Sequence, residues 1–280
     1  MTKLSGDLIR HKLATYTIGQ NVLSVEQTGS TNTELKRLAR TGAPEGLLYI
    51  ADEQLVGRGR LERDWIAPAG SSLLISLLFR PSFLPPDRVQ QLTMICALAM
   101  VEAIEAETGL SPDLKWPNDL IWHDGKKLAG ILTEAEFEGN QVSWVVVGVG
   151  LNVNIDFSSH TARLPDRPGR PGTGSPPLGE IATSLSMILG RETTHLRLPI
   201  LQGFLQKVER RYEAIKQGQS PHQEWQARLI GLGQMVTITN VADNQRWQGK
   251  MIGVSATGAL QVERADGQIE TVLAGDVTLK

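Results

Sequence analysis

The sequence predicts an α+β protein in which a large mixed unit of strands and helices is followed by a small β unit. Apolar runs of strand type occupy residues 46–51 and 71–79. Apolar residues recur at helical spacing over residues 87–108 and 197–217. After Gly231 the chain changes to short alternating strands separated by turns. Together these patterns predict a sheet covered by helices and a separate C-terminal β unit.

Composition and charge limit the function classes. The 280 residues are 41% hydrophobic and 21% charged, with a net charge of -2, which is typical of a globular protein and excludes a surface that is basic throughout. Any anion site must therefore be local. The single cysteine, Cys96, lies in an apolar run and is interpreted as a buried, inert thiol. The N-terminus has no apolar signal-peptide region and no apolar run reaches bilayer length, so a cytoplasmic location is predicted.

The N-terminal third begins with a predicted strand at residues 20–27. Thr31 and Glu34 fit a capping box that opens a helix ending near Gly42 and Pro44. Hydroxyls and free amides at such a helix start also suit a polar ligand.

In the middle of the chain, the sequence predicts a helix over residues 87–108 that covers a sheet. It then predicts strand structure over 114–122, interrupted by a turn at Pro117 and Asn118. Gly139 and Asn140 separate two strands, 130–138 and 141–149, as in an antiparallel hairpin. The Pro- and Gly-rich stretch 158–179 predicts a surface loop.

The C-terminal third predicts three helices and a small β-barrel. The predicted domains are residues 1–231 and residues 232–280, the second of which forms the barrel. The predicted helices cover 181–189, 197–217 and 222–229, and the predicted strands cover 234–240, 245–254, 260–264 and 269–272.

The loop from Asp52 to Trp65 carries the strongest chemical signal. Gly57 and Gly59 allow positive φ and a close approach of the backbone to a ligand, and three arginines between positions 58 and 63 form a local anion site. The loop is neither a Walker loop nor a dinucleotide fingerprint, because no Gly-Lys-Ser/Thr follows and no helix opens on the glycines. Taken alone, the loop is also compatible with a solvated basic turn or an RNA-binding patch.

Five motifs in order resemble the biotin protein ligases. They are Gly-Ser-Thr-Asn at 29–32, the arginine loop with Gln54 and Trp65, Lys-Trp-Pro-Asn-Asp at 115–119, Lys-Leu-Ala-Gly-Ile-Leu at 127–132 and Gly-Leu-Asn-Val-Asn at 150–154. The resemblance implies a mixed sheet with flanking helices, related to class II aminoacyl-tRNA synthetases, and a small SH3-like barrel. A DNA-binding domain needs about sixty residues, more than precede Gly29, so the monofunctional type is expected.

The resemblance also implies a reaction. Biotin and ATP, with Mg²⁺, would form biotinyl-5′-AMP and pyrophosphate, and a lysine of a biotin carboxyl carrier protein, such as that of acetyl-CoA carboxylase, would then accept the biotin. Neither DNA nor a membrane is an expected partner. A homodimer is possible, since an exposed sheet edge could pair two subunits.

Site roles follow from the same resemblance. The implied catalytic residues are Lys127, Arg60, Lys115 and Asp119, of which Asp119 could ligate Mg²⁺ or accept a proton from the attacking amine. Residues implied to bind biotin are Ser30, Thr31, Asn32, Gln54, Arg58, Gly59, Arg60, Lys127 and Gly130. Residues implied to bind the nucleotide are Arg60, Arg63, Trp65, Asn118 and Asn152.

Departures from the family pattern and rival functions remain open at this point. Glu62 stands where glycine is common and Val56 where a smaller residue is usual, which could alter the ordering of the loop. A lipoate or octanoate ligase shares the architecture but lacks the arginine loop. A nucleic-acid-binding module and a biotin-binding protein without catalysis are two further rival functions. The five histidines show no metal-ligand spacing.

Overall fold

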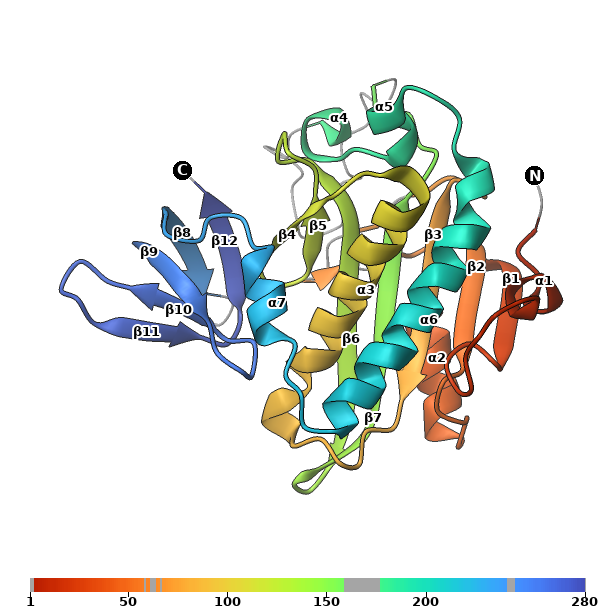
Figure 1. The fold of residues 1–280 in the computed structure, drawn as a ribbon, viewed down its shortest axis with the longest axis horizontal. Helices are drawn as coiled ribbons and strands as arrows, with labels where there is room; N and C mark the ends of the chain where they lie inside the picture. The colour runs from red at the N-terminus through yellow and green to blue at the C-terminus, as the bar shows by residue number, and fades with distance from the viewer. Residues whose placement is uncertain are drawn as a thin grey trace.

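Two β-sheets organise the chain (Figure 1). The computed structural model describes residues 3–57, 59–60, 64–65, 67–158, 177–240 and 245–279. The larger sheet has seven strands in the order β1-β2-β3-β7-β6-β5-β4. Its strands are β1 Val22–Thr28, β2 Leu48–Gln54, β3 Ser72–Phe79, β4 Asp113–Lys115, β5 Asp119–Ile121, β6 Lys127–Glu138 and β7 Gln141–Asn152.

The larger sheet is mixed, as predicted. β1 and β2 run parallel, and every other neighbouring pair is antiparallel. The hairpin of β6 and β7 turns at Gly139, whose φ of 59° lies in the left-handed region that glycine adopts without strain. This hairpin places the predicted motifs at 127–132 and 150–154 on neighbouring strands.

Two long helices cover one face of the larger sheet. α3 (Gln90–Thr108) and α6 (Arg197–Lys216) lie side by side across it in Figure 1. Residues of α3 such as Leu98 and residues of α6 such as Leu201 are fully buried against Ile75 and Val147 in the main core. Burial of this apolar surface provides most of the energy that holds the helices on the sheet.

α3 and the turn before it also meet the length and hydropathy of a membrane span, over Pro86–Thr108 with a mean hydropathy of 1.3. This corrects the expectation that no segment of the chain reaches bilayer length. Within it, 72% of the most apolar 18-residue stretch is buried, as in the core helix of a globular protein.

A shorter helix covers part of the opposite face. α2 (Thr31–Arg40) buries Leu35 and Ala39 against Trp144 and Val146 of β7. The predicted capping box is wrong, because Ser30 is the N-cap and its side chain makes no capping hydrogen bond. The Thr31 hydroxyl contacts Gln54 instead, which turns the start of the helix toward the loop after β2.

The second sheet has five antiparallel strands in the order β11-β10-β9-β8-β12. Its strands are β8 Met235–Asn240, β9 Arg246–Val254, β10 Leu260–Glu263, β11 Ile269–Val272 and β12 Gly275–Leu279. The sequence predicts the first four strands and misses β12. The sheet projects from the side of the molecule where β4 and β5 lie (Figure 1). Trp116 Nε1 donates to the carbonyl of Gly258 at 3.0 Å and fastens the second sheet to the first.

The predicted fold class is confirmed: a mixed sheet with flanking helices is followed by an antiparallel β unit. The exact domain boundary near Leu232 stays a prediction. The predicted helix over 181–189 is in fact two short helices, α4 (Leu178–Ile181) and α5 (Leu185–Leu189), because Ala182 forms a β-bridge with Lys127. Most of the predicted surface loop 158–179 lies outside the described residues.

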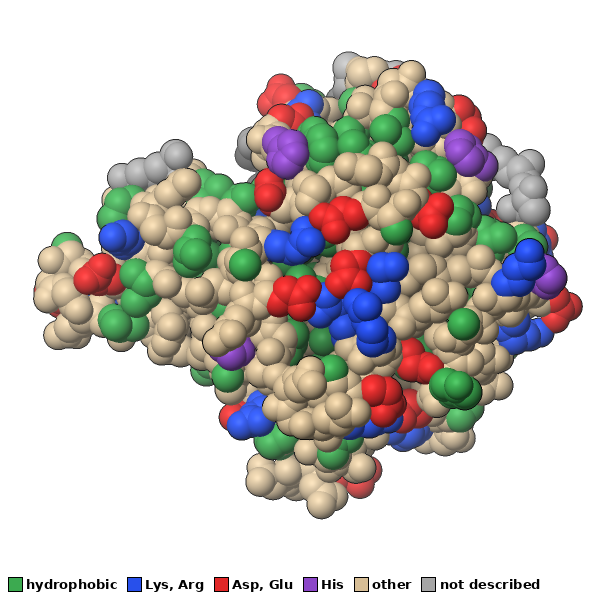
Figure 2. All heavy atoms as spheres, in the orientation of Figure 1, with side chains coloured by type: hydrophobic (Ala, Val, Ile, Leu, Met, Phe, Trp, Pro, Cys, Tyr) green, Lys and Arg blue, Asp and Glu red, His purple; other side chains and the backbone are tan. Residues whose placement is uncertain are grey.

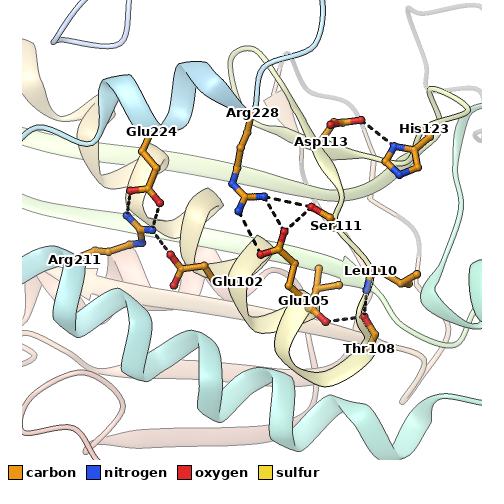
Figure 3. A network of polar contacts seen from close by, with 11 residues as sticks. Glu102, Glu105, Thr108, Leu110, Ser111, Asp113, His123, Arg211, Glu224 and Arg228 are labelled. Carbon is orange, nitrogen blue, oxygen red and sulfur yellow. Dashed lines mark hydrogen bonds and ion pairs between the residues drawn. The ribbon is translucent and has the colours of Figure 1, made fainter.

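Acidic and basic side chains gather over the helical face in Figure 2, and Figure 3 shows how they pair. Arg211 of α6 binds both Glu102 of α3 and Glu224 of α7 (His222–Ala227). Arg228, just after α7, donates to the two carboxylate oxygens of Glu105 at 2.8 and 3.3 Å. The network therefore holds the segment that leads into the second sheet against α3.

We expect the Arg228–Glu105 pair to contribute to stability in a pH-dependent way. Burial by itself would raise the pKa of Glu105, but hydrogen bonds from Arg228 and Ser111 and the charge of Arg228 lower it below its ordinary value of 4.5. The pair therefore stabilises the fold above the unfolded pKa, and this stabilisation is lost as the pH falls through the folded pKa. Arg228→Met should lower the free energy of unfolding at pH 7 and have little effect near the acid limit.

Urea unfolding at several pH values measures this effect. Arg246→Met, at an exposed position of β9, is the control. The interpretation fails if the loss caused by Arg228→Met is the same at pH 7 as at the lowest pH where the protein still folds.

Candidate active site

One pocket of about 510 Å³ opens on the face of the larger sheet that α2 covers in part, beside the C-terminal sheet. The space is within the range of small-molecule sites. The residues that line it come from the start of α2, the arginine loop, strands β4 to β7, the segment around α4, and β12.

Glycines on β7 make room for the pocket. Side chains alternate along a strand, so positions 144, 146, 148, 150 and 152 share one face of the sheet. The first two are Trp144 and Val146, which pack under α2. At the next two the structure has glycine: a Cβ at Gly148 would lie 2.1 Å from Asn32 Oδ1, and one at Gly150 would lie 2.6 Å from the Trp65 ring. The two glycines thus let Asn32 and Trp65, which line the pocket, lie directly against the sheet.

At the end of the pocket near Gly148 the lining side chains are polar and hydrogen-bonded to one another and to the backbone. Ser30, Thr31 and Asn32 are each no more than 6% exposed. The Thr31 N–H donates to Gln54 Oε1 at 2.8 Å, and the Asn32 amide donates to the carbonyl of Leu132 at 3.1 Å. The start of α2, the end of β2 and strand β6 therefore present one fixed set of donors and acceptors.

The middle of the pocket holds Lys127, whose Nζ lies 2.7 Å from Asp119 Oδ1. The contact is short but too poorly aligned for a hydrogen bond, so it is an ion pair of two partly exposed groups. Lys127 Nζ also lies 5.5 Å from the centre of the Trp65 ring. The ammonium therefore lies between Asp119 and the Trp65 ring, at a point in the pocket where it can meet an entering anion.

Trp65 covers the floor of the pocket at Gly150. Its backbone N–H donates to the carbonyl of Gly57 at 2.9 Å and closes the arginine loop on itself. Glycine is required at 57 because a Cβ there would lie 2.5 Å from the Trp65 carbonyl oxygen. The indole Nε1 is buried and finds no hydrogen-bond acceptor among the described residues, so a ligand acceptor at this point would remove a desolvation cost of about 1–3 kcal/mol.

Arg60 joins the two sheets across the pocket. Its Nη1 donates to Asn118 Oδ1 at 3.3 Å and its Nη2 donates to the carbonyl of Gly275 at 3.1 Å. Asp276 of β12 lies 3.8 Å from the same guanidinium. The C-terminal sheet is thus part of the site.

The other predicted residues also lie at the pocket. Asn118 donates to the carbonyl of Ile131 at 2.6 Å, and this bond fixes the turn that holds Arg60. Asn152, which is 3% exposed, donates to the carbonyl of Thr183 at 3.0 Å. Lys115, Gly59 and Gly130 line the pocket directly.

The donor set is suited to Mg²⁺ carried by a nucleotide. In the described residues no three metal-ligating side chains meet in one cluster. A magnesium ion on ATP is commonly held by one or two carboxylates together with phosphate oxygens. The carboxylates that line the pocket are Asp64, Asp119, Asp124, Glu180 and Asp276. Asp119 would fit this role, as an alternative to accepting a proton.

The predicted site residues therefore meet in one place, apart from Arg58 and Arg63, which lie outside the described residues together with Glu62. Sequence reasoning missed the contribution of β12 through Asp276, Val277 and Thr278. Alternating apolar residues at 277 and 279 were the signal for that strand. No pattern in the sequence indicates that it reaches the pocket.

Comparisons with known proteins also point to the biotin protein ligases. A model described as the Biotin/lipoate A/B protein ligase family matches residues 24–152, and the Biotin protein ligase C terminal domain matches residues 231–280. The bifunctional ligase/repressor BirA of Bacillus subtilis is 34% identical over 99% of this chain and 79% of its own length. The biotin--[acetyl-CoA-carboxylase] ligase of Paracoccus denitrificans is 30% identical over 84% of this chain and 90% of its own length.

A solved structure agrees with these relatives. The biotin protein ligase from Aquifex aeolicus, in complex with biotin and ATP, superposes with a TM-score of 0.72 at 26% identity, covering 93% of this chain and 99% of that one. With 93% of the chain covered, the match includes most of both sheets. The chain belongs to the biotin protein ligase family.

Proposed function

We propose that this protein is a biotin–carrier protein ligase that activates biotin with ATP and transfers it to a lysine of a biotin carboxyl carrier protein. The observation that carries the proposal is the order of groups along β7. The polar end lies at Gly148, Trp65 lies at Gly150 with Lys127 beside it at the paired Gly130 of β6, and Asn152 follows. Successive positions on one face of a strand are about 7 Å apart. The order fits a ligand with a polar ring at one end and a carboxylate at the other.

The polar end favours biotin over lipoate or octanoate. A cyclic urea offers two N–H donors and one carbonyl acceptor, and Ser30, Thr31 and Gln54 can hydrogen-bond to such a ring. A dithiolane or an alkyl chain offers these groups no N–H donor and no carbonyl acceptor, so it would forgo ligand hydrogen bonds that contribute about 0.5–1.5 kcal/mol each.

In the first step, a carboxylate oxygen of biotin attacks the α-phosphorus of ATP. A new P–O bond forms, the bond to the β-phosphate oxygen breaks, and pyrophosphate leaves. Two anions approach each other in this step, so the site must supply positive charge that is already in place. Lys127 supplies it at the middle of the pocket, and Arg60, anchored by Asn118 and β12, supplies it beside the nucleotide.

In the second step, the amine of the carrier lysine attacks the carbonyl carbon of the adenylate. The amide bond forms, AMP leaves, and the amine loses a proton. Asp119 is placed to accept this proton because its carboxylate lines the pocket and is released when Lys127 moves to the phosphate. The proposal places the protein in the cytoplasm, where ATP and carrier proteins are present.

The test is exchange of labelled pyrophosphate into ATP, which reports the first step alone. We expect exchange that requires biotin and Mg²⁺ and is absent with lipoate or octanoate. Folded protein that shows no biotin-dependent exchange would exclude the proposed activity. A second assay, transfer of biotin to a purified carrier domain, then tests the second step.

The outer edge of β6 supports the proposed homodimer. Among the described residues, β5 pairs with β6 only as far as Gly130, so the edge from Thr133 to Glu138 has no strand beside it. Phe137 on this stretch is 48% exposed. An open edge of this length can pair with a second copy of the chain. Sedimentation velocity should show a dimer that Ala135→Pro weakens, and an unchanged monomer at all concentrations would contradict it.

A further inference from the structure

One row of residues crosses the pocket face of the larger sheet from its middle to its edge. Gly150 of β7 pairs with Gly130 of β6. Gly130 pairs with Asp119 of β5, and Asp119 pairs with Lys115 of β4, the last strand of the sheet. All four residues line the pocket, as directly paired residues on one face of a sheet do. Neighbouring strands lie about 4.8 Å apart, so Lys115 stands about 14 Å from Gly150.

Lys115 differs from the other cations of the pocket because it has no anionic partner. Arg60, Lys115 and Lys127 are the arginine and lysine side chains in the described lining. Lys127 pairs with Asp119 at 2.7 Å, and Arg60 lies 3.8 Å from Asp276. Lys115 Nζ forms neither an ion pair nor a hydrogen bond with any described residue, although its side chain is partly buried. The positive charge at the outer end of the row is therefore available to an anion that enters the pocket.

The backbone of Lys115 is held firmly on both sides of the turn that follows it. Its carbonyl accepts from the N–H of Asn118 at 3.1 Å. Within the turn, Trp116 donates to the second sheet, and the carbonyl of Pro117 accepts from Gln90 of α3 at 3.3 Å. The freedom of Lys115 therefore lies in its side chain. A compact charge on a flexible stem suits a group that must bind an anion and then release it.

The proposed first step needs two anion positions, and the row provides them. Lys127 Nζ and the Trp65 ring both lie over Gly130, where the α-phosphate would meet the biotin carboxylate. The ring fills the side toward β7, and Asp119 and then Lys115 follow on the other side. A carboxylate thus stands between the two lysines and separates an inner anion position from an outer one. The outer position is left for the two phosphates of ATP that depart.

We propose that Lys115 binds the β- and γ-phosphates of ATP and the pyrophosphate that they become, and that it has no part in the transfer of biotin to the carrier. This inference rests on the proposed function. When the bond between the α-phosphorus and the bridging oxygen breaks, the electron pair stays on that oxygen. The ammonium of Lys115 stabilises the added negative charge through its own charge and its N–H groups. In the reverse direction the same group receives pyrophosphate.

Calorimetry with ATP and with AMP tests the position of this charge without turnover. Lys115→Met removes the ammonium and keeps an unbranched stem. The affinity for ATP, measured with Mg²⁺, should fall by about 10- to 100-fold, because a hydrogen bond between charged groups is lost. The affinity for AMP, which lacks the two outer phosphates, should stay within about twofold. Lys115→Arg keeps the charge and should recover most of the affinity for ATP.

The two half-reactions distinguish this role from a structural one. In pyrophosphate exchange, the Lys115→Met variant should lose about 10- to 100-fold in kcat/KM for both ATP and pyrophosphate, while the KM for biotin stays within about twofold. Transfer from chemically prepared biotinyl-5′-AMP to a purified carrier domain involves no pyrophosphate. Its rate should therefore stay within about twofold of the native rate. A disturbed fold would slow both half-reactions together.

Lys126→Met is the matched control. Lys126 carries the same charge, lies 3.9 Å from Asp124 and is not among the described residues that line the pocket. This variant should bind ATP and AMP as the native enzyme does.

Three results would overturn the assignment of Lys115. They are an equal loss of affinity for ATP and AMP in Lys115→Met, no change in either affinity, and a transfer from the prepared adenylate that slows as much as exchange does. In each case biotin-dependent exchange by the native enzyme would still support the proposed function. A native enzyme that shows no such exchange would disprove the proposed function, and the comparison of ATP with AMP would still decide whether Lys115 binds the outer phosphates.

Discussion

Lys127→Ala is expected to reduce biotin-dependent pyrophosphate exchange by about 10²- to 10³-fold, equivalent to a loss of about 2.7–4 kcal/mol of transition-state stabilisation. The ammonium stands at the middle of the pocket, over Trp65 and beside Asp119. Negative charge increases there when a carboxylate meets a phosphate. Water would replace the lost ammonium poorly, because it must reorganise as the charge develops.

Lys126, the residue just before β6, provides a matched control. Lys126 carries the same charge one residue earlier but reaches Asp124 at only 3.9 Å, on the exposed turn before β6. Lys126→Ala should keep exchange within about twofold, since exposed ion pairs contribute about 0–1 kcal/mol. Comparable losses in both variants would show that net charge near the pocket, and not the position of Lys127, governs the rate.

The kinetic pattern distinguishes catalysis from binding. If Lys127 stabilises mainly the transition state, the variant should lose kcat and kcat/KM to a similar extent. A rise in the KM for biotin with kcat unchanged would assign Lys127 to ground-state binding of the carboxylate. Burst measurements of adenylate formation separate this step from transfer to the carrier.

The larger sheet and most of the pocket could be predicted because their signals are local. The Gly139–Asn140 turn fixes the hairpin of β6 and β7, and the motifs on both strands then lie side by side. Helical spacing likewise predicts α6 almost to its ends. Structure that depends on residues close together in the sequence, such as a turn or a helix, can be predicted from the sequence pattern.

Contacts between distant segments left no such pattern. β12 has two alternating apolar residues and could pass for a turn, yet its Gly275 carbonyl holds Arg60 from 215 positions away. Ser76 looks like a polar residue on a buried strand, and only the positions of Thr31 and Asn32 give it a role. The Thr31–Glu34 capping pattern misled because Gln54, brought in by β2, competes for the Thr31 hydroxyl. In all three places the structure depends on contacts between segments that are far apart in the sequence.

The second large expected effect is a loss of stability when Arg197 is replaced. From the sequence this residue is only the first of an amphipathic helix, but in the structure it is a buried cation. Its side chain is 2% exposed. Nη2 donates to Asp52 Oδ1 at 2.7 Å and Nε donates to the carbonyl of Ser72 at 3.0 Å. Asp52 lies near the end of β2, before the arginine loop, and Ser72 begins β3, so one guanidinium joins the two strands that flank the loop. The N-terminus of α6 disfavours a cation, and Asp52 therefore provides the compensation.

Arg197→Met should lower the free energy of unfolding by about 3–5 kcal/mol, because removal of one partner leaves the other charge and a carbonyl without a partner in a largely buried place. Arg210→Met is the control: Arg210 pairs with Glu102 at the surface, Glu102 keeps Arg211, and the loss should stay below about 1 kcal/mol. Urea unfolding measures both. Adding Asp52→Asn to Arg197→Met should recover part of the stability, since no carboxylate is then stranded. If the double variant is less stable than Arg197→Met alone, the ion pair is not what holds the base of the loop, and packing of the arginine stem must do so.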